Sequence, residues 1–288
     1  MIPKVLLQKH LGLETTAYHE VLDAHFRRFR NFFADGSPTK QSFGSLLALD
    51  KDYYNQAVRN NTVTYFFPGM IPSPLFEIFK YNGYTTTTFH YGPHFGVEKG
   101  PYVDNFYNEY NFSLVNGVCD FIDTEGWRKP TFLGYCALIK SWKVRTALTK
   151  LGILDQSKQD IDFLIDHMRE GLQKDEPQII VAYLFSPGHT PYRKFDRKIE
   201  GALDKYKQYY LDKSKETALK LKKLVTFVAS EDPQSIVYVF GDHGPYISGW
   251  EFFDDNYTFM IQDRFGVYGG IYPRDRCVES FAKPGHLD

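Results

Sequence analysis

An aspartate and a histidine follow directly after an apolar segment in the last fifth of the chain. Residues 236–240 form a continuous run of apolar, β-branched or aromatic side chains, which predicts a buried, parallel strand. Gly241 ends this run, and Asp242 and His243 come next. Binding residues of an open α/β sheet lie just beyond the carboxyl ends of its strands, and a carboxylate oxygen beside an imidazole nitrogen can bind a divalent cation. The alternative is an ordinary turn in which the aspartate is a cap.

Thr39 offers a hydroxyl at the predicted start of a helix. The turn-forming residues 35–38 precede it, and a helical pattern begins at Gln41. Unpaired N–H groups and the positive end of the helix dipole favour an anionic ligand there, and they favour the deprotonated form of a hydroxyl. The structural alternative for Thr39 is a helix cap.

Two further histidines and a lysine lie where predicted strands give way to loops. His189 follows a predicted strand over residues 179–185, and His90 ends a threonine-rich strand predicted over residues 84–90. The Gly- and Pro-rich loop after His90 carries Lys99, and loops in this position often contribute to function. The alternatives are a histidine satisfied within its turn, a surface histidine and a solvated lysine.

Helical patterns alternate with these strands along most of the chain. They cover residues 3–30, with a start near Leu13, and then the segment from Gln41, followed by residues 74–82, 156–173 and 196–229. Alternation of strands and helices predicts a mostly parallel sheet with helices on both sides. In residues 103–138 the apolar side chains follow neither a helical nor a strand periodicity.

The composition of the 288-residue chain argues against one class of partner and against two kinds of segment. A formal charge of −1 and the lack of a basic block argue against nucleic acid, and no apolar run is long enough to span a membrane or to act as an export signal. The 21 Tyr and 25 Phe fit a sugar- or lipid-handling surface, or a well-filled core. The spacing of the cysteines does not match a zinc site, and Cys119 and Cys136 are either a disulfide or two buried thiols.

Three stretches, taken in order, resemble the alkaline phosphatase and sulfatase superfamily, and most closely its lipoteichoic-acid-synthase-type phosphoglycerol transferases and its phosphoethanolamine transferases. They are Gly-Ser-Pro-Thr-Lys-Gln-Ser-Phe-Gly-Ser-Leu-Leu from Gly36, Tyr-Leu-Phe-Ser-Pro-Gly-His-Thr-Pro-Tyr from Tyr183, and Val-Tyr-Val-Phe-Gly-Asp-His-Gly from Val237. The resemblance covers roughly residues 10–275. It implies an α/β fold, a three-layer α/β/α sandwich with a mostly parallel central sheet like that of alkaline phosphatase, in a single catalytic domain over residues 1–288.

The resemblance also implies a reaction and assigns the residues named above to it. Thr39 attacks a phosphate ester and forms a phosphothreonine intermediate, while Thr39, Asp242 and His243 bind a divalent metal, Zn or Mn. His189 donates to the phosphate or the leaving oxygen, and substrate contacts fall to His90, Lys99 and His189. The implied substrate is a phospholipid or phosphorylated glycan of the cell envelope, in an extracytoplasmic setting.

Two departures from the family pattern leave catalysis open. In the family, a strand before the nucleophile ends in an acidic metal ligand, and this chain has no counterpart of that strand before Thr39. The C-terminal part of this chain is also shorter than that of family members. We therefore expect a piece of a longer, membrane-anchored protein. A catalytically impaired protein that binds a phosphorylated glycan or lipid headgroup is therefore one alternative. A sulfatase-type hydrolase is another, although the Ser-Pro-Thr-Lys-Gln sequence from Ser37 lacks the Cys/Ser-x-Pro-x-Arg motif from which sulfatases make formylglycine.

Overall fold

The structure is a computed structural model, and it describes a defined part of the chain. The described residues are 4, 7–8, 12–29, 32–34, 39–50, 73–90, 101–108, 150–151, 161–184, 201–244, 261 and 265–275. By its internal contacts the chain divides into two compact units: Met1–Ser45 with Phe185–Asp288, and Leu46–Leu184. We call these the first and the second unit. The prediction of a single catalytic domain over residues 1–288 stays a prediction.

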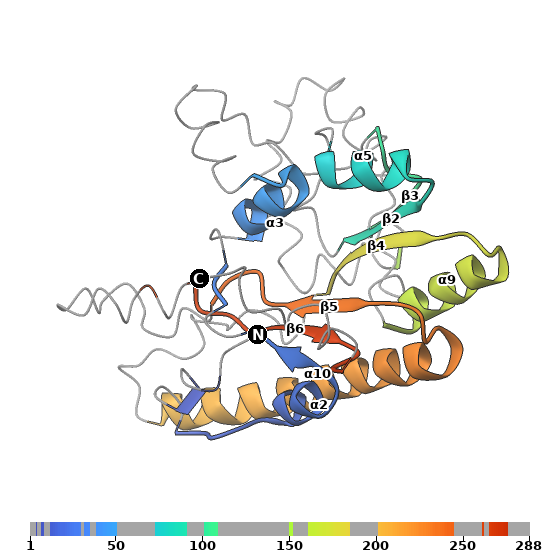
Figure 1. Cartoon of the computed structure of the whole chain (residues 1–288). Coiled ribbons are helices and arrows are strands. Elements are labelled where there is room, and N and C mark those ends of the chain that lie inside the picture. The colour runs from blue at the N-terminus through green and yellow to red at the C-terminus, as the bar shows by residue number, and fades with distance from the viewer. Residues whose placement is uncertain are drawn as a thin grey trace, which may run out of the picture. The chain divides into compact units, whose positions relative to one another are not determined.

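Two helices pack together in the first unit, α2 (Ala17–His25) and the long α10 (Ala202–Glu231) (Figure 1). Val21 and Leu22 of α2 are buried in the core that they share with α10. The hydroxyl groups of Tyr18 and Tyr210 lie 2.6 Å apart and join the two helices through a buried hydrogen bond. Both helices were predicted: α2 lies within the predicted range 3–30, and α10 runs from Ala202 to Glu231, where a helix over residues 196–229 was expected.

The sheet of the first unit has the order β1 (Arg27–Arg28), β6 (Gly269–Tyr272) and β5 (Val237–Phe240), and both pairings are antiparallel. Val237 and Val239 pack on the α2–α10 core, whereas Tyr238 is 61% exposed. The prediction of a buried, parallel strand over residues 236–240 is therefore wrong in its pairing and in its burial. An antiparallel sheet with one covered face alternates buried and exposed side chains, and a run of apolar residues does not reveal its partner strand.

The second unit contains a wholly parallel sheet of the order β3 (Asn105–Asn108), β2 (Thr85–His90) and β4 (Gln178–Tyr183). Helix α5 (Pro74–Tyr81) precedes β2, and α9 (Ile161–Gln173) precedes β4. Ser73 caps α5, and Gly83 takes the left-handed conformation (φ 81°) that the turn into β2 requires. This α5–Gly83–β2 segment matches its prediction.

The two helices of the second unit cover opposite faces of its sheet. Phe76 of α5, 1% exposed, packs with the side chains of Val103, Ile179 and Val181. Phe163 of α9 instead meets Phe89 of β2 at 5.8 Å between ring centroids, and successive residues of a strand point to opposite faces. Burial of each such ring contributes about 2–3 kcal/mol. The predicted α/β class is confirmed, and this unit shows the helix–sheet–helix layering.

None of the described helices combines the length and apolar character needed to cross a membrane.

Candidate functional site

The turn after β5 carries the predicted pair Asp242 and His243, and backbone contacts of the first unit hold it. Gly241 is buried, and its N–H donates to the carbonyl oxygen of Tyr268, just before β6, at 2.9 Å. This bond continues the β5–β6 pairing by one residue, so the turn begins at a fixed point on the sheet edge. The antiparallel partner thus positions the turn, although a parallel neighbour was expected.

The two side chains of the turn face each other. Nε2 of His243 lies 3.5 Å from Oδ2 of Asp242, and the exposed fractions of the two side chains are 10% and 19%. Nδ1 of His243 lies 2.8 Å from the carbonyl oxygen of Gly244. Because a carbonyl oxygen can only accept, Nδ1 carries the proton, and in the neutral ring Nε2 then presents its lone pair.

A lone pair beside a carboxylate oxygen suits a cation. Ligands at about 2.1 Å from a tetrahedral metal lie roughly 3.4 Å apart, close to the separation of the two side-chain atoms. A histidine that donates its other ring N–H to a backbone carbonyl is also the usual arrangement for a metal ligand. The pair therefore fits a divalent metal, although no third His, Cys, Asp or Glu joins it within the described ranges.

Helix α3 (Thr39–Ala48) begins two residues before the helical pattern predicted from Gln41, and Thr39 lies at its N-terminus as expected. Ser42, in its first turn, donates a hydrogen bond from Oγ to the backbone carbonyl of Asp242. This bond links the start of α3 to the turn that carries Asp242 and His243. The side chain of Thr39 itself lies outside the described residues, so its role as nucleophile and metal ligand stays a prediction.

The sequence did not point to Ser42, because its partner lies 200 residues further along the chain. The only available signal was its spacing of three residues from Thr39, which places both positions on one side of a helix.

The remaining predicted site residues stay untested. His189 and Lys99 lie outside the described residues, as do Cys119 and Cys136. His90 is the last residue of β2, in the second unit, and its side chain is not among those described.

Carboxylates before Thr39 do not offer a replacement for the expected acidic ligand in the part of the chain that is described. Glu14 lies at an exposed bend before α2, Glu20 and Asp23 lie on α2, and Asp23 forms an ion pair with Lys4.

Comparison with known proteins gives one family and two solved structures. Residues 8–276 match the family model described as Sulfatase. The crystal structure of Ps i-CgsB in complex with k-i-k-neocarrahexaose is similar over 91% of this chain and 61% of that one, with 13% identity and a TM-score of 0.51. The crystal structure of Ps i-CgsB gives 12% identity, coverage of 89% and 60%, and a TM-score of 0.48.

At these identities the likeness bears on the fold alone, and the chain spans about three fifths of the length of both structures. A search of curated proteins finds no match.

Proposed function

The chain belongs to the sulfatase family, and on this premise we propose that it is a metal-dependent enzyme that cleaves a phosphate ester through the hydroxyl of Thr39. The observation that carries the proposal is the hydrogen bond from Ser42 to the carbonyl of Asp242. It ties the helix that begins at Thr39 to the turn with the paired side chains of Asp242 and His243.

In the proposed reaction, the hydroxyl of Thr39 loses its proton to solvent, and its oxygen forms a bond to phosphorus as the ester bond breaks, while the leaving oxygen takes a proton from His189. Water or an acceptor hydroxyl then takes the phosphoryl group from Thr39 and gives its own proton to His189, and the oxygen of Thr39 regains a proton from solvent. Asp242 and His243 would bind the metal, whose contribution is to favour the alkoxide of Thr39 and to neutralise charge on the phosphate. The N–H groups at the start of α3 would favour the same negative charge.

Zn and Mn both suit a carboxylate and an imidazole as ligands. His90 and Lys99 stay candidates for further contacts with the phosphate.

A phosphorylated glycan is the substrate class that we favour over a phospholipid. The support is the structural neighbour with a TM-score of 0.51, which is in complex with the oligosaccharide k-i-k-neocarrahexaose. Transfer of phosphoglycerol or phosphoethanolamine and an extracytoplasmic setting remain compatible proposals.

Sulfate ester hydrolysis is the second candidate, because the family match itself favours it. Against it stands Thr39, since a threonine cannot supply the formylglycine that sulfatases make from Cys or Ser in a Cys/Ser-x-Pro-x-Arg motif. A phosphate ester needs only a hydroxyl nucleophile.

Turnover of chromogenic esters tests the proposal. Chelator-treated protein is reloaded with Mn²⁺ or Zn²⁺ and assayed with p-nitrophenyl phosphate, bis-p-nitrophenyl phosphate and p-nitrophenyl sulfate. We expect metal-dependent cleavage of a phosphate ester that falls by about 10³-fold or more in Thr39→Ala and in Asp242→Asn. Thr39→Ser, which keeps a hydroxyl, should retain measurable turnover.

Three results contradict the proposal. Undiminished turnover in Thr39→Ala excludes Thr39 as the nucleophile. Turnover confined to p-nitrophenyl sulfate favours sulfate ester hydrolysis. Binding of phosphorylated glycan without turnover of any ester indicates a catalytically impaired protein.

A further inference from the structure

We propose that Ser42 is a positioning residue that holds the turn of Asp242 and His243 in register with the first turn of α3. This inference rests on the proposed function, in which the turn binds a metal and Thr39 reacts beside it. It assigns a role to a hydroxyl that neither the residue pattern nor the family resemblance singled out.

The geometry of α3 makes Ser42 suited to this task. Thr39 begins the helix and Ser42 follows three residues later, so the two positions lie on the same side, one turn apart. Ser42 is half-buried and is followed by buried Phe43, so the helix is fixed at this point. Its Oγ–H donates to the backbone oxygen of Asp242. A displacement of the turn relative to Thr39 would have to stretch this bond.

The Asp242–His243 turn is held from two directions by different kinds of contact. From the sheet side, the carbonyl of Tyr268 accepts the N–H of Gly241 at 2.9 Å. From the helix side, Ser42 donates to the carbonyl of Asp242. Within the turn, the bond from Nδ1 of His243 to the carbonyl of Gly244 orients the imidazole. Of these contacts, only the one from Ser42 relates the two candidate ligands to α3.

The hydrogen bond to Asp242 indicates that Ser42 does not itself attack the substrate. A serine hydroxyl carries one proton, and that proton is directed to the carbonyl of Asp242, which cannot act as a base. Ser42 also lies inside the helix, whereas the N–H groups without helical partners lie at its start, around Thr39. The hydroxyl of Ser42 therefore acts through the backbone of a ligand residue.

Loss of this hydroxyl should affect metal binding and chemistry more than folding. Outer contacts that orient metal ligands typically change metal affinity or activity by about 10–100-fold when they are removed. We therefore expect Ser42→Ala to weaken Mn²⁺ binding by about 10-fold or more and to lower kcat, with little change in KM. Ser42→Thr keeps a hydroxyl that can donate to the carbonyl oxygen of Asp242, so it should recover most of the Mn²⁺ affinity and most of kcat.

The matched control is Ser230→Ala in α10, because it removes a bond of the same kind. Ser230 is exposed, and its Oγ donates to the carbonyl of Thr226 at 2.9 Å. Mn²⁺ affinity is measured by isothermal titration calorimetry for wild type and all three variants, together with kcat, KM and the urea midpoint. The midpoints show that each variant is folded. Selective loss of Mn²⁺ affinity and kcat in folded Ser42→Ala, with recovery in Ser42→Thr, supports the inference.

Two results overturn it, and they are distinguishable. If wild type binds Mn²⁺ and turns over a phosphate ester, but Ser42→Ala matches Ser230→Ala in affinity and kcat, Ser42 has no positioning role and the proposed function stands. If wild type neither binds Mn²⁺ nor cleaves an ester, the proposed function fails and the role of Ser42 fails with it.

Discussion

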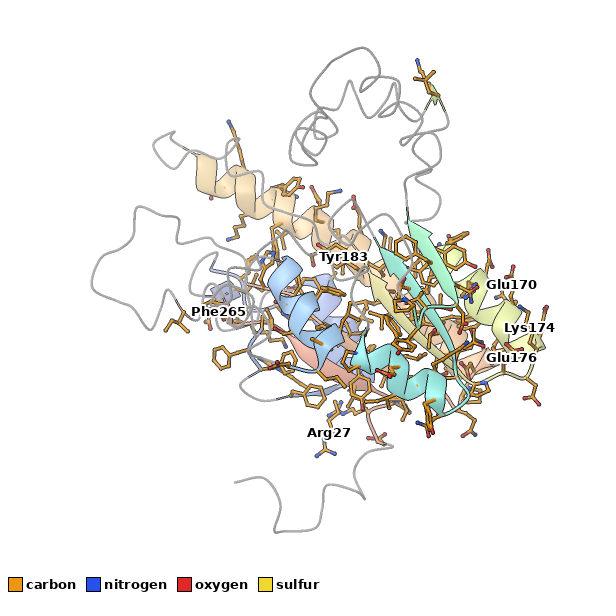
Figure 2. All side chains as sticks on the ribbon, turned by 90° about the horizontal axis from the view of Figure 1, so that it is seen from above. Arg27, Glu170, Lys174, Glu176, Tyr183 and Phe265 are labelled. Carbon is orange, nitrogen blue, oxygen red and sulfur yellow. The ribbon has the colours of Figure 1, made fainter. Side chains whose placement is uncertain are left out.

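At the scale of single residues, His167 of α9 is held between two hydroxyl groups on the sheet of the second unit. Oγ1 of Thr87 lies 3.3 Å from its Nε2, and the hydroxyl of Tyr107 lies 3.2 Å from its Nδ1. Glu170 and Lys174 lie near one another by the end of α9 (Figure 2), and Nδ1 of His167 is 3.9 Å from the Glu170 carboxylate. Burial lowers the pKa of His167 below its ordinary 6.5, with Glu170 opposing and Lys174 adding to this effect.

This lowered pKa predicts that acid weakens the second unit. The unfolded chain binds the proton more readily than the folded one, so the stabilisation by neutral His167 is complete above pH 6.5. It is lost as the pH falls below 6.5 and through the lowered folded pKa. The urea midpoint should therefore decrease more between pH 8 and pH 5 for wild type than for His167→Gln. Equal falls in the two proteins would show that His167 does not titrate in this way.

At the scale of elements, Ser73 of the second unit joins the start of α5 to the last residues of α3, which belong to the same unit. It is 6% exposed, its Oγ donates to the carbonyl of Leu47 at the end of α3 at 2.8 Å, and the same oxygen accepts the N–H of Phe76 at 3.4 Å. One hydroxyl thus caps α5 and also satisfies a carbonyl near the end of α3.

Ser73→Ala should lower the free energy of unfolding by about 1–2 kcal/mol, because the variant loses a helix cap and leaves a buried carbonyl without its donor. Urea denaturation provides the measurement. Exposed Ser230→Ala is the control and should change the free energy by less than about 0.5 kcal/mol. A loss in Ser73→Ala no larger than in the control would mean that the cap contributes little.

Elements defined by local signals could be predicted from the sequence, whereas contacts between distant segments could not. The amphipathic pattern over residues 74–82 and the glycine at position 83 predict α5 and its end, and turn formers before Thr39 predict that this residue lies at a helix N-terminus. The pairing of β5 with β6 and the bond from Ser42 to Asp242 join segments that no local pattern relates. Asp242 and His243 were therefore predicted as a pair, while the residue that links them to α3 was not.

At the scale of the whole molecule, membership of the sulfatase family and the arrangement of the first unit constrain the chemistry together. The family favours attack on a tetrahedral ester, and the sequence places a threonine at the start of α3. We propose that Thr39 becomes covalently attached to the phosphoryl group during turnover.

Mass spectrometry of the acid-quenched protein can detect this covalent intermediate. Wild type is loaded with Mn²⁺, mixed with bis-p-nitrophenyl phosphate and quenched early; its intact mass is measured, and its peptides are then sequenced. We predict a p-nitrophenylphosphoryl adduct on the peptide that contains Thr39, because one of the two ester groups stays on phosphorus, and we expect fragmentation to assign it to Thr39 and Thr39→Ala to lack it. An adduct on another residue, or turnover by wild type with an adduct that persists in Thr39→Ala, would show that Thr39 is not the nucleophile.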